Sequence, residues 1–243
     1  MAFSCLSVVA IWIAWLIAYV CIRNDYIFPS FWDVIKEMGK QFVSSVFWTA
    51  FLHTLLRTLI SFVVSLMLGI VLALLSEFFG WLRAFIAPVV TVLRTLPTMA
   101  VILILLIWTN PLVAPAVVTV LVLFPAVYAA SIAAFDGIGG EYESLCQAYG
   151  VSKINRAFKM YLPLSIPALL TQSGAIASMG LKVTVSAEVL SSTFKSLGGM
   201  MHEAQAFLNV SALFALTILT VLTGFLIEGV CYLLKKYAVR WRV

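Results

Sequence analysis

Five ionisable residues interrupt long apolar stretches of this sequence, and their surroundings decide what chemistry they can do. They are Arg57, Arg94, Lys182, Glu188 and Glu228. A charge near the centre of a lipid bilayer costs about 3 kcal/mol, so such residues normally pair with one another or face a water-filled cavity. Arg57 lies near the start of one apolar stretch and Glu188 near the end of another, which places both towards the same side of the membrane and permits an ion pair between them. Arg94 and Lys182 have no acid nearby in sequence and would give a cavity a positive lining.

The remaining polar residues do not form the groups that enzymes use. The four cysteines are Cys5, Cys21, Cys146 and Cys231. They lack the spacing of a zinc site or a disulfide framework, and His53 and His202 lie far apart in the chain. A nucleotide-binding phosphate loop needs Gly-Lys followed by Ser or Thr, whereas the only Gly-Lys pair, Gly39-Lys40, precedes Gln41. The sequence therefore predicts no catalytic residue, no metal site and no ATP site in this chain.

The composition requires a lipid environment for much of the chain. Its 243 residues are 63% hydrophobic and 10% charged, with a mean hydropathy of +1.11. Soluble domains carry about 25% charged residues. The formal charge is +5, but the basic residues flank apolar stretches and form no single patch. This pattern is typical of membrane topology and argues against nucleic-acid binding.

The apolar stretches predict an all-α membrane protein with about six transmembrane helices. A helix needs about 20 apolar residues to cross the bilayer. The predicted ranges are 5–22, 48–76, 84–108, 112–135, 163–191 and 207–234. The first has no preceding basic residue and no cleavage site, which favours a retained helix over a signal peptide. Thr109-Asn110-Pro111 is the predicted turn between the third and fourth spans, and Pro97 and Pro115 predict bends.

The basic residues also predict the orientation. An even number of spans puts both termini on one side, and the loops on that side carry more positive charge. Their basic residues are Arg83, Lys153, Arg156, Lys159, Lys235, Lys236, Arg240 and Arg242, against Arg23, Lys36, Lys40 and Lys195 on the other side. Because positive loops stay in the cytoplasm, both termini are predicted to be cytoplasmic. Residues 32–43 show apolar residues at helical spacing among charged ones, which predicts a helix lying flat at the outer interface.

Residues 136–162 form the longest segment between spans, on the predicted cytoplasmic side. Glu141 and Glu143 suit the start of a helix, where the dipole favours acids. Gly150 would end that helix, and Ser152 can cap a second one beginning at Lys153. Pro163 and Pro167 follow at the entry into the next span. This predicts a helix–Gly–helix elbow parallel to the membrane, which suits docking of another protein; an ordinary connecting loop is the alternative.

The elbow resembles the ATPase-coupling motif of permease subunits in binding-protein-dependent ABC importers. That motif reads Glu-Ala-Ala, three residues, Gly, nine residues, Ile, one residue and Leu-Pro. Counted from Gly150, the Leu-Pro falls on Leu162-Pro163 and the Ile position is Met160. The sequence departs from the motif at its start, where Ser144-Leu145-Cys146 replaces Glu-Ala-Ala and the acid is one residue earlier at Glu143.

Other segments resemble the nitrate/sulfonate/taurine class of these permeases, in order along nearly the whole chain. They are Leu93–Thr98, Phe124–Asp136, Gly180-Leu181-Lys182 with Ala187-Glu188, the turn Ser196–Gly199, and the Arg240-Trp241 ending. The resemblance implies one type I ABC importer transmembrane domain over 1–243, in a bacterial-type cytoplasmic membrane. It also implies a second and identical permease chain, a cytoplasmic ABC ATPase dimer that binds ATP and Mg²⁺, and an extracytoplasmic solute-binding protein.

Two sets of residues receive roles, the first from the resemblance and the second from the charges and prolines within the predicted spans. The ATPase-coupling set is Glu143, Gly150, Val151, Ser152, Lys153, Ile154, Asn155, Arg156, Ala157 and Phe158. The set expected along a translocation path is Arg94, Pro97, Lys182 and Glu188, and its positive charges favour an anionic solute. An ion-coupled secondary transporter or channel is the alternative function. It would use the membrane charges but has no reason to keep the spacing from Gly150 to Pro163.

Overall fold

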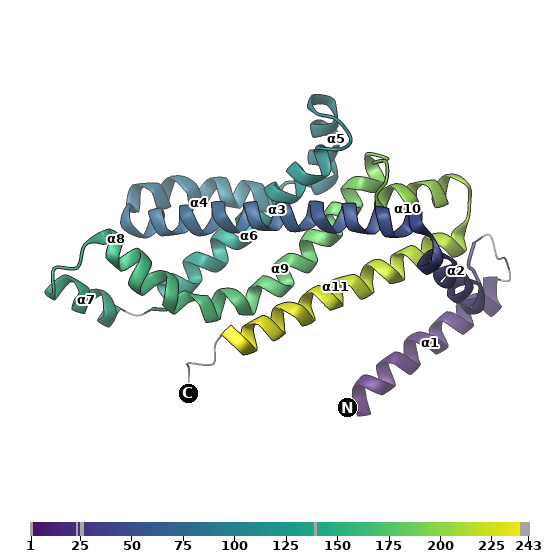
Figure 1. The fold of residues 1–243 in the computed structure, drawn as a ribbon, viewed down its shortest axis with the longest axis horizontal. Coiled ribbons are helices and arrows are strands. Elements are labelled where there is room, and N and C mark those ends of the chain that lie inside the picture. The colour runs from purple at the N-terminus through teal and green to yellow at the C-terminus, as the bar shows by residue number, and fades with distance from the viewer. Residues whose placement is uncertain (1, 23, 25–26, 139, 239–243) are drawn as a thin grey trace.

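The computed structural model describes residues 2–22, 24, 27–138 and 140–238, and only the backbone of residues 2–9, 11 and 141. Arg23, Asp25 and the Arg240-Trp241 ending lie outside the described residues. Every regular element in the described part is helical, as predicted (Figure 1). The helices are α1 (Ala2–Ile22), α2 (Phe31–Val43), α3 (Ser45–Phe78), α4 (Gly80–Thr95), α5 (Thr98–Trp108), α6 (Ala114–Asp136), α7 (Gly140–Ala148), α8 (Lys153–Arg156), the π-helical turn η1 (Ala157–Tyr161), α9 (Leu162–Leu190), α10 (Leu197–Ala206) and α11 (Val210–Ala238).

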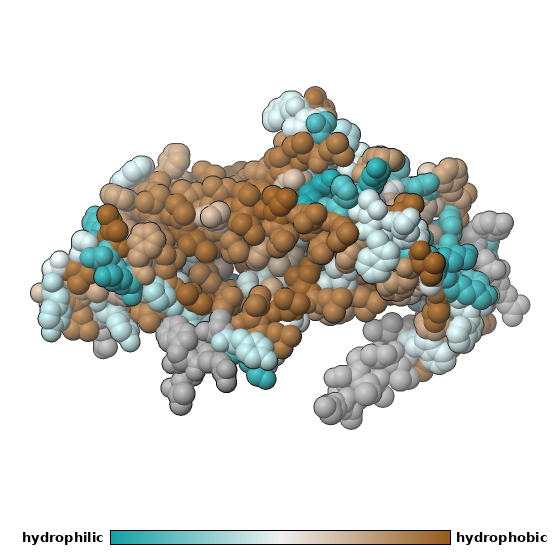
Figure 2. All heavy atoms as spheres, in the orientation of Figure 1, coloured by the Kyte–Doolittle hydropathy of each residue, from teal (hydrophilic) through white to brown (hydrophobic). Residues whose placement is uncertain are grey.

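Most of the predicted spans are single long helices. Four helices of the described part are long and apolar enough to cross a bilayer, at Ser45–Phe78, Ala114–Asp136, Lys153–Leu190 and Val210–Tyr237. Within α1, the stretch Trp12–Ile22 is a shorter apolar helix. Figure 2 shows the corresponding surface, in which apolar residues cover the middle of the molecule and polar residues gather towards its two ends. This apolar middle is what a membrane-spanning bundle presents to lipid.

The span predicted over 84–108 is broken into two helices, and the bend expected at Pro97 is present. α4 and α5 meet at 97°, and together they make at most one bent span. The residue before a proline is forced out of the helical region by the proline ring. Leu96 accordingly has an extended ψ of 131° and Pro97 precedes the first residue of α5. The bend expected at Pro97 is therefore large enough to turn α5 away from the body of the molecule (Figure 1).

α3 packs along α6 and α9 through small and hydroxyl-bearing side chains. Its buried residues recur every three or four positions and are Phe47, Ala50, Thr54, Thr58, Ser61, Ser65, Gly69, Ala73 and Ser76. Large apolar residues of α3 lie on its outer face, because lipid solvates them as well as a protein core would. Several of the buried hydroxyls donate to backbone carbonyls: the Ser61 hydroxyl donates to the Ala116 carbonyl at 3.1 Å, and the Ser65 hydroxyl to the Ser61 carbonyl at 2.8 Å.

α2 is the amphipathic helix predicted at 32–43. Ser30 caps it by accepting a hydrogen bond from the Asp33 amide at 3.2 Å. The Ser30 hydroxyl also donates to the Asp33 carboxylate at 2.7 Å, and with Lys36 it holds the pKa of Asp33 below its usual value. α2 buries Val34 and packs beside α11, close to α10 at the end of the molecule opposite α7 (Figure 1).

The close approach of α3 and α6 depends on Gly69. A Cβ at this position would lie 2.6 Å from Val127 Cγ1 and 3.0 Å from the Tyr128 backbone nitrogen. Gly69→Ala should therefore destabilise the bundle by about 1–3 kcal/mol, the cost of overpacking a core. The measurement is the midpoint of thermal unfolding in mild detergent, followed by size-exclusion chromatography. Gly229→Ala is the matched control, because nothing lies within 4 Å of that Cβ in α11; equal midpoints for the two variants would contradict the prediction.

Candidate functional site

The elbow predicted at 136–162 is present as two helical arms joined at Gly150. α7 ends at Ala148, and Gly150 adopts a left-handed φ of 64°, a conformation that costs other residues about 1–2 kcal/mol. The Val151 amide then donates to the Cys146 carbonyl at 2.9 Å, which closes the turn. Ser152 caps the second arm by accepting from the Asn155 amide at 3.4 Å. The predicted roles of Gly150 and Ser152 in the backbone are confirmed.

Arg156 ties the two arms together. Its Nε donates to the Val151 carbonyl at 3.0 Å, and its Nη1 lies 3.9 Å from Glu143 Oε1 on α7. The Arg156 side chain is only 18% exposed, so this brace lies largely inside the elbow. The side chains of Glu143 and Arg156, both assigned to coupling, therefore hold the two arms of the elbow together. Contact with a partner would then fall to other side chains of the elbow.

The second arm is not the separate short helix that the sequence predicts. α8 continues through η1 into α9, so Lys153–Leu190 is a single helical rod. Pro163 has no amide hydrogen, and a proline ring inside an α-helix clashes with the carbonyl four residues earlier. The wider π-helical turn just before Pro163 gives the ring room, with the Leu162 amide bonded to the Ala157 carbonyl. The elbow is thus a direct extension of a membrane helix.

The elbow exposes several large apolar and aromatic side chains among polar ones such as Gln147 and Lys159. These large side chains are Tyr142, Leu145, Tyr149, Ile154 and Phe158, and Tyr149 is 83% exposed. Ile154 and Phe158 also line a hollow of about 440 Å³ against the end of α3. Lys153 lies beside it, with Nζ 5.0 Å from the centre of the Phe79 ring.

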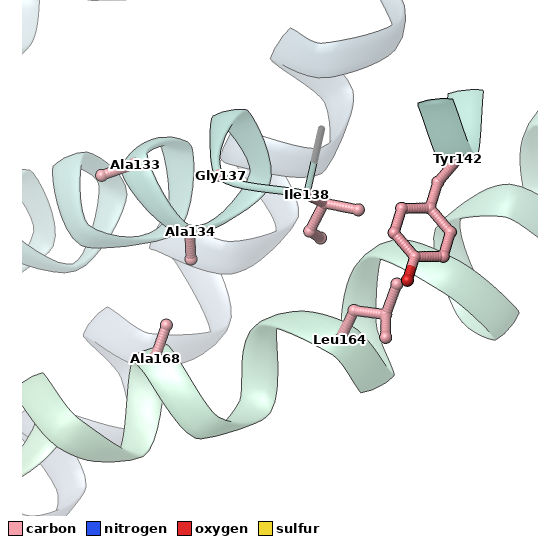
Figure 3. Close-up of a pocket in the computed structure, with 7 residues that line it drawn as sticks. All are labelled: Ala133, Ala134, Gly137, Ile138, Tyr142, Leu164 and Ala168. Atoms are coloured by element: carbon pink, nitrogen blue, oxygen red, sulfur yellow. The ribbon is translucent and has the colours of Figure 1, made fainter. Parts of the chain in front are cut away.

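A second hollow, of about 320 Å³, lies between the elbow and the bundle. It is lined by Ala133, Ala134, Gly137, Ile138, Tyr142, Leu164 and Ala168. Figure 3 shows the Tyr142 and Leu164 side chains close together on one side of this hollow, with Ala133, Ala134 and Ala168 on the other. Its lining holds no charged side chain, so this hollow could receive an apolar group but has no charged group to bind an ion.

Glu188 is buried within the helix bundle, where it contacts its predicted partner Arg57. Glu188 is 0% exposed and the Arg57 side chain 13% exposed, and the two form an ion pair. Glu188 also accepts hydrogen bonds from the Thr54 hydroxyl at 2.8 Å and from the Gly198 amide at 3.2 Å. The Leu197 amide donates to Thr54 Oγ1 at 2.9 Å. Glu188 thus joins α3, α9 and the start of α10, and its carboxylate is presented to no surface in this conformation.

Thr54 and Gly198 complete this cluster, and neither was predicted to contact Glu188. Thr54 precedes Arg57 by one turn on the same face of α3, a signal that could have indicated it. Gly198 is required because a Cβ there would lie 2.3 Å from the Glu188 Cβ.

The other membrane charges stay apart. Arg94 and Lys182 are exposed on α4 and α9, and neither forms an ion pair within the described residues. Lys182 lines a hollow of about 160 Å³ together with Glu228, which accepts a hydrogen bond from Ser178 at 2.5 Å. Pro97 begins the α5 arm. The four residues assigned to a path are therefore not gathered at one point of the single chain.

Comparison with known proteins identifies the family. Residues 65–238, which include the elbow and the helices on both sides of it, match the family model of the binding-protein-dependent transport system inner membrane component. The chain belongs to this family. It is accordingly a permease subunit of a binding-protein-dependent ABC importer, and permeases of this family are transporters and not enzymes. No curated protein matches its sequence significantly.

Solved ABC transporter structures share the fold of this permease. An inward-facing crystal form of the MetNI methionine ABC transporter superposes with a TM-score of 0.66 at 15% identity, covering 87% of this chain and 99% of the other. An amino acid ABC transporter crystallised with histidines gives a TM-score of 0.63 at 15% identity, covering 80% and 93%. The fold is therefore that of the type I ABC importer permeases, as predicted.

Breaking the buried ion pair should be severe. Glu188→Ala leaves the Arg57 cation without its partner in an apolar setting, which costs about 3–5 kcal/mol for buried pairs. The permease should lose its folded peak in size-exclusion chromatography or unfold at a much lower temperature. Replacing both partners, as Arg57→Met with Glu188→Leu, should recover part of the loss. Arg94→Gln, at an exposed cation, is the control and should leave the midpoint unchanged. A Glu188→Ala midpoint equal to that of Arg94→Gln would contradict the structural role.

Proposed function

We propose that the elbow is the surface on which a cytoplasmic ABC ATPase dimer docks, so that ATP-driven closure of that dimer moves the permease. The support is the braced shape of the elbow, its exposed apolar side chains and its continuity with α9. A rigid extension of a membrane helix transmits a push that a flexible loop would absorb. ATP and Mg²⁺ then belong to the ATPase. The chain contributes the ATPase-coupling residues Glu143 and Gly150 to Phe158.

The translocation path is proposed to form between this permease and a second, identical chain, with solute delivered by an extracytoplasmic binding protein. Arg94 and Lys182 are exposed cations in membrane-spanning helices, and because neither forms an ion pair with another described residue, they favour a water-filled path. Such a path suits a small anionic solute of the nitrate, sulfonate or taurine type. The solved relatives are named for methionine and other amino acids, but at 15% identity they show the fold alone.

The orientation follows from charge. We place the elbow and both termini in the cytoplasm, because the more basic loops stay on that side. The opposite end, with α2 and α10, then faces outwards, in a bacterial-type cytoplasmic membrane.

Docking predicts the effect of a bulky charge at the elbow. Gly150→Arg forces a side chain into a left-handed conformation and adds a cation to the turn. We expect the tagged variant to reach the membrane but to lose most of the Walker-motif ATPase that co-purifies with the parent permease in mild detergent. Gly39→Arg, in open space on α2 at the other end of the molecule, is the control and should retain the ATPase. Equal retention in both variants would refute docking at the elbow.

The proposed path predicts that uptake depends on the two exposed cations, Arg94 and Lys182. Arg94→Gln and Lys182→Gln should each lower uptake of nitrate, taurine or an alkanesulfonate by about tenfold, since removing a charge contact to an anion costs on the order of 1.4 kcal/mol. ATPase retention should not change. The measurement is uptake of labelled solute into vesicles that contain permease, ATPase and binding protein. Unchanged uptake by both variants would exclude a cationic path. Uptake that survives ATP depletion but fails with the ion gradient would favour a secondary transporter.

A further inference from the structure

A polar cluster at the turn between α3 and α4 meets the beginning of the elbow. Arg83 lies just after this turn, and its guanidinium donates two hydrogen bonds to Asp136, at 3.0 Å to Oδ1 and 2.7 Å to Oδ2. Asp136 is the last residue of α6 and directly precedes the elbow. Paired hydrogen bonds of this kind fix the direction of approach as well as the distance. The first end of the elbow is therefore held to α4.

The same cluster meets the other end of the elbow. Tyr161, the last residue of η1, donates its hydroxyl hydrogen to Glu77 Oε1 at 3.3 Å. The second oxygen of Glu77 lies 3.8 Å from Arg83 Nη1. The Tyr161 ring is buried between Phe78 and Phe135, with ring centres 5.8 Å and 5.6 Å away. Residues 136 and 161, which bracket the elbow, thus converge on one point of the α3–α4 turn.

We infer that Arg83 is a positioning residue for coupling: it clamps both ends of the elbow to the α3–α4 turn so that the elbow, α3 and α4 move as one body. This role rests on the proposed docking of an ATPase at the elbow. The segment after Asp136 begins with Gly137 and Gly140, which have little resistance to bending. Without the clamp, a push on the elbow would bend this segment, so it would reach the bundle only along α9 and would no longer carry α3 and α4 with it.

Arginine is required here because of its shape. Lysine keeps the positive charge but cannot make the paired bonds to Asp136 and reach Glu77 at once. The Arg83 and Asp136 side chains are 42% and 49% exposed, so removing the clamp should leave the fold intact. Exposed pairs of this kind change a local opening equilibrium by about twofold to fivefold.

The test uses the full permease bound to its co-purifying ATPase in lipid nanodiscs, with amide hydrogen exchange followed by mass spectrometry. In the parent complex, ATP with Mg²⁺ and vanadate should change exchange both in the elbow, at 140–152, and at the far end, in α10. Arg83→Gln should retain the same amount of ATPase. Its elbow should exchange about twofold to fivefold faster without nucleotide, the range for an exposed pair. Nucleotide should still change the elbow but should change α10 less than in the parent, because α3, which contacts α10, no longer moves with the elbow.

Two further variants make the outcome decisive. Arg83→Lys should fall between the parent and Arg83→Gln, and it serves if Arg83→Gln does not fold. Lys236→Gln, which removes an exposed cation on α11, should behave as the parent does. An Arg83→Gln complex whose α10 responds to nucleotide like the parent's would overturn the clamp while leaving docking intact. Failure of the parent permease itself to retain an ATPase would overturn the docking proposal, and the clamp with it.

Discussion

The fold of this permease depends on how closely α3 can approach its neighbours. In lipid, apolar surface gains little by moving from the bilayer into a protein interior, so helices associate through packing and hydrogen bonds between small residues. α3 meets this constraint with a stripe of alanine, serine, threonine and one glycine that runs along its whole buried face. In the middle of this stripe, the hydroxyls of Thr58, Ser61 and Ser65 donate to carbonyls of α3 itself or of α6. The same stripe carries Thr54 at one end and Ser76 at the other, where it meets the Glu188 cluster and the Tyr128 hydroxyl.

Both ends of α3 carry polar contacts that fix a segment outside the membrane bundle. At one end, Glu188 and Thr54 receive the amides of Leu197 and Gly198 and so position α10. At the other, Glu77 receives the Tyr161 hydroxyl at the end of the elbow. A buried ion pair adds little net stability, since the cost of removing both charges from water offsets their attraction. Its consequence is specificity: Glu188 accepts bonds from two helices besides its own, and only one arrangement of α3, α9 and α10 satisfies it.

The positions of the long apolar helices could be predicted from the sequence because hydrophobic length largely determines them. Their number and limits could not be predicted in full: about six spans were predicted, whereas four helices of the described part, or up to five spans with the bent pair, are long and apolar enough, and the helix predicted to begin at 163 begins at Lys153. The pairing of Arg57 with Glu188 could also be predicted, because two opposite charges in lipid are satisfied by few arrangements other than an ion pair. The bend at Pro97 and the π-helical turn before Pro163 were not predicted in their observed form. A proline breaks the regular hydrogen bonds in both cases, but the surrounding packing decides between a 97° bend and a continuous rod. From the sequence, Arg83 was predicted only to be one of the basic residues of a cytoplasmic loop. Its contacts with Asp136 and Glu77 could not be predicted, because they depend on how α3, α4 and α6 pack together.

The two prolines have opposite effects because of what lies beside each. Pro97 follows Leu96 in extended conformation, and α5 buries only Ile102 among its residues, so little packing opposes the bend. Pro163 stands where Ala157, Met160 and Tyr161 are all buried against the ends of α3 and α6. A sharp bend there would expose these side chains, whereas a π-helical turn keeps them buried and gives the proline ring room. The packing that keeps this helix continuous also joins the elbow to α9, so a displacement of the elbow reaches the membrane through a helix and not through a hinge.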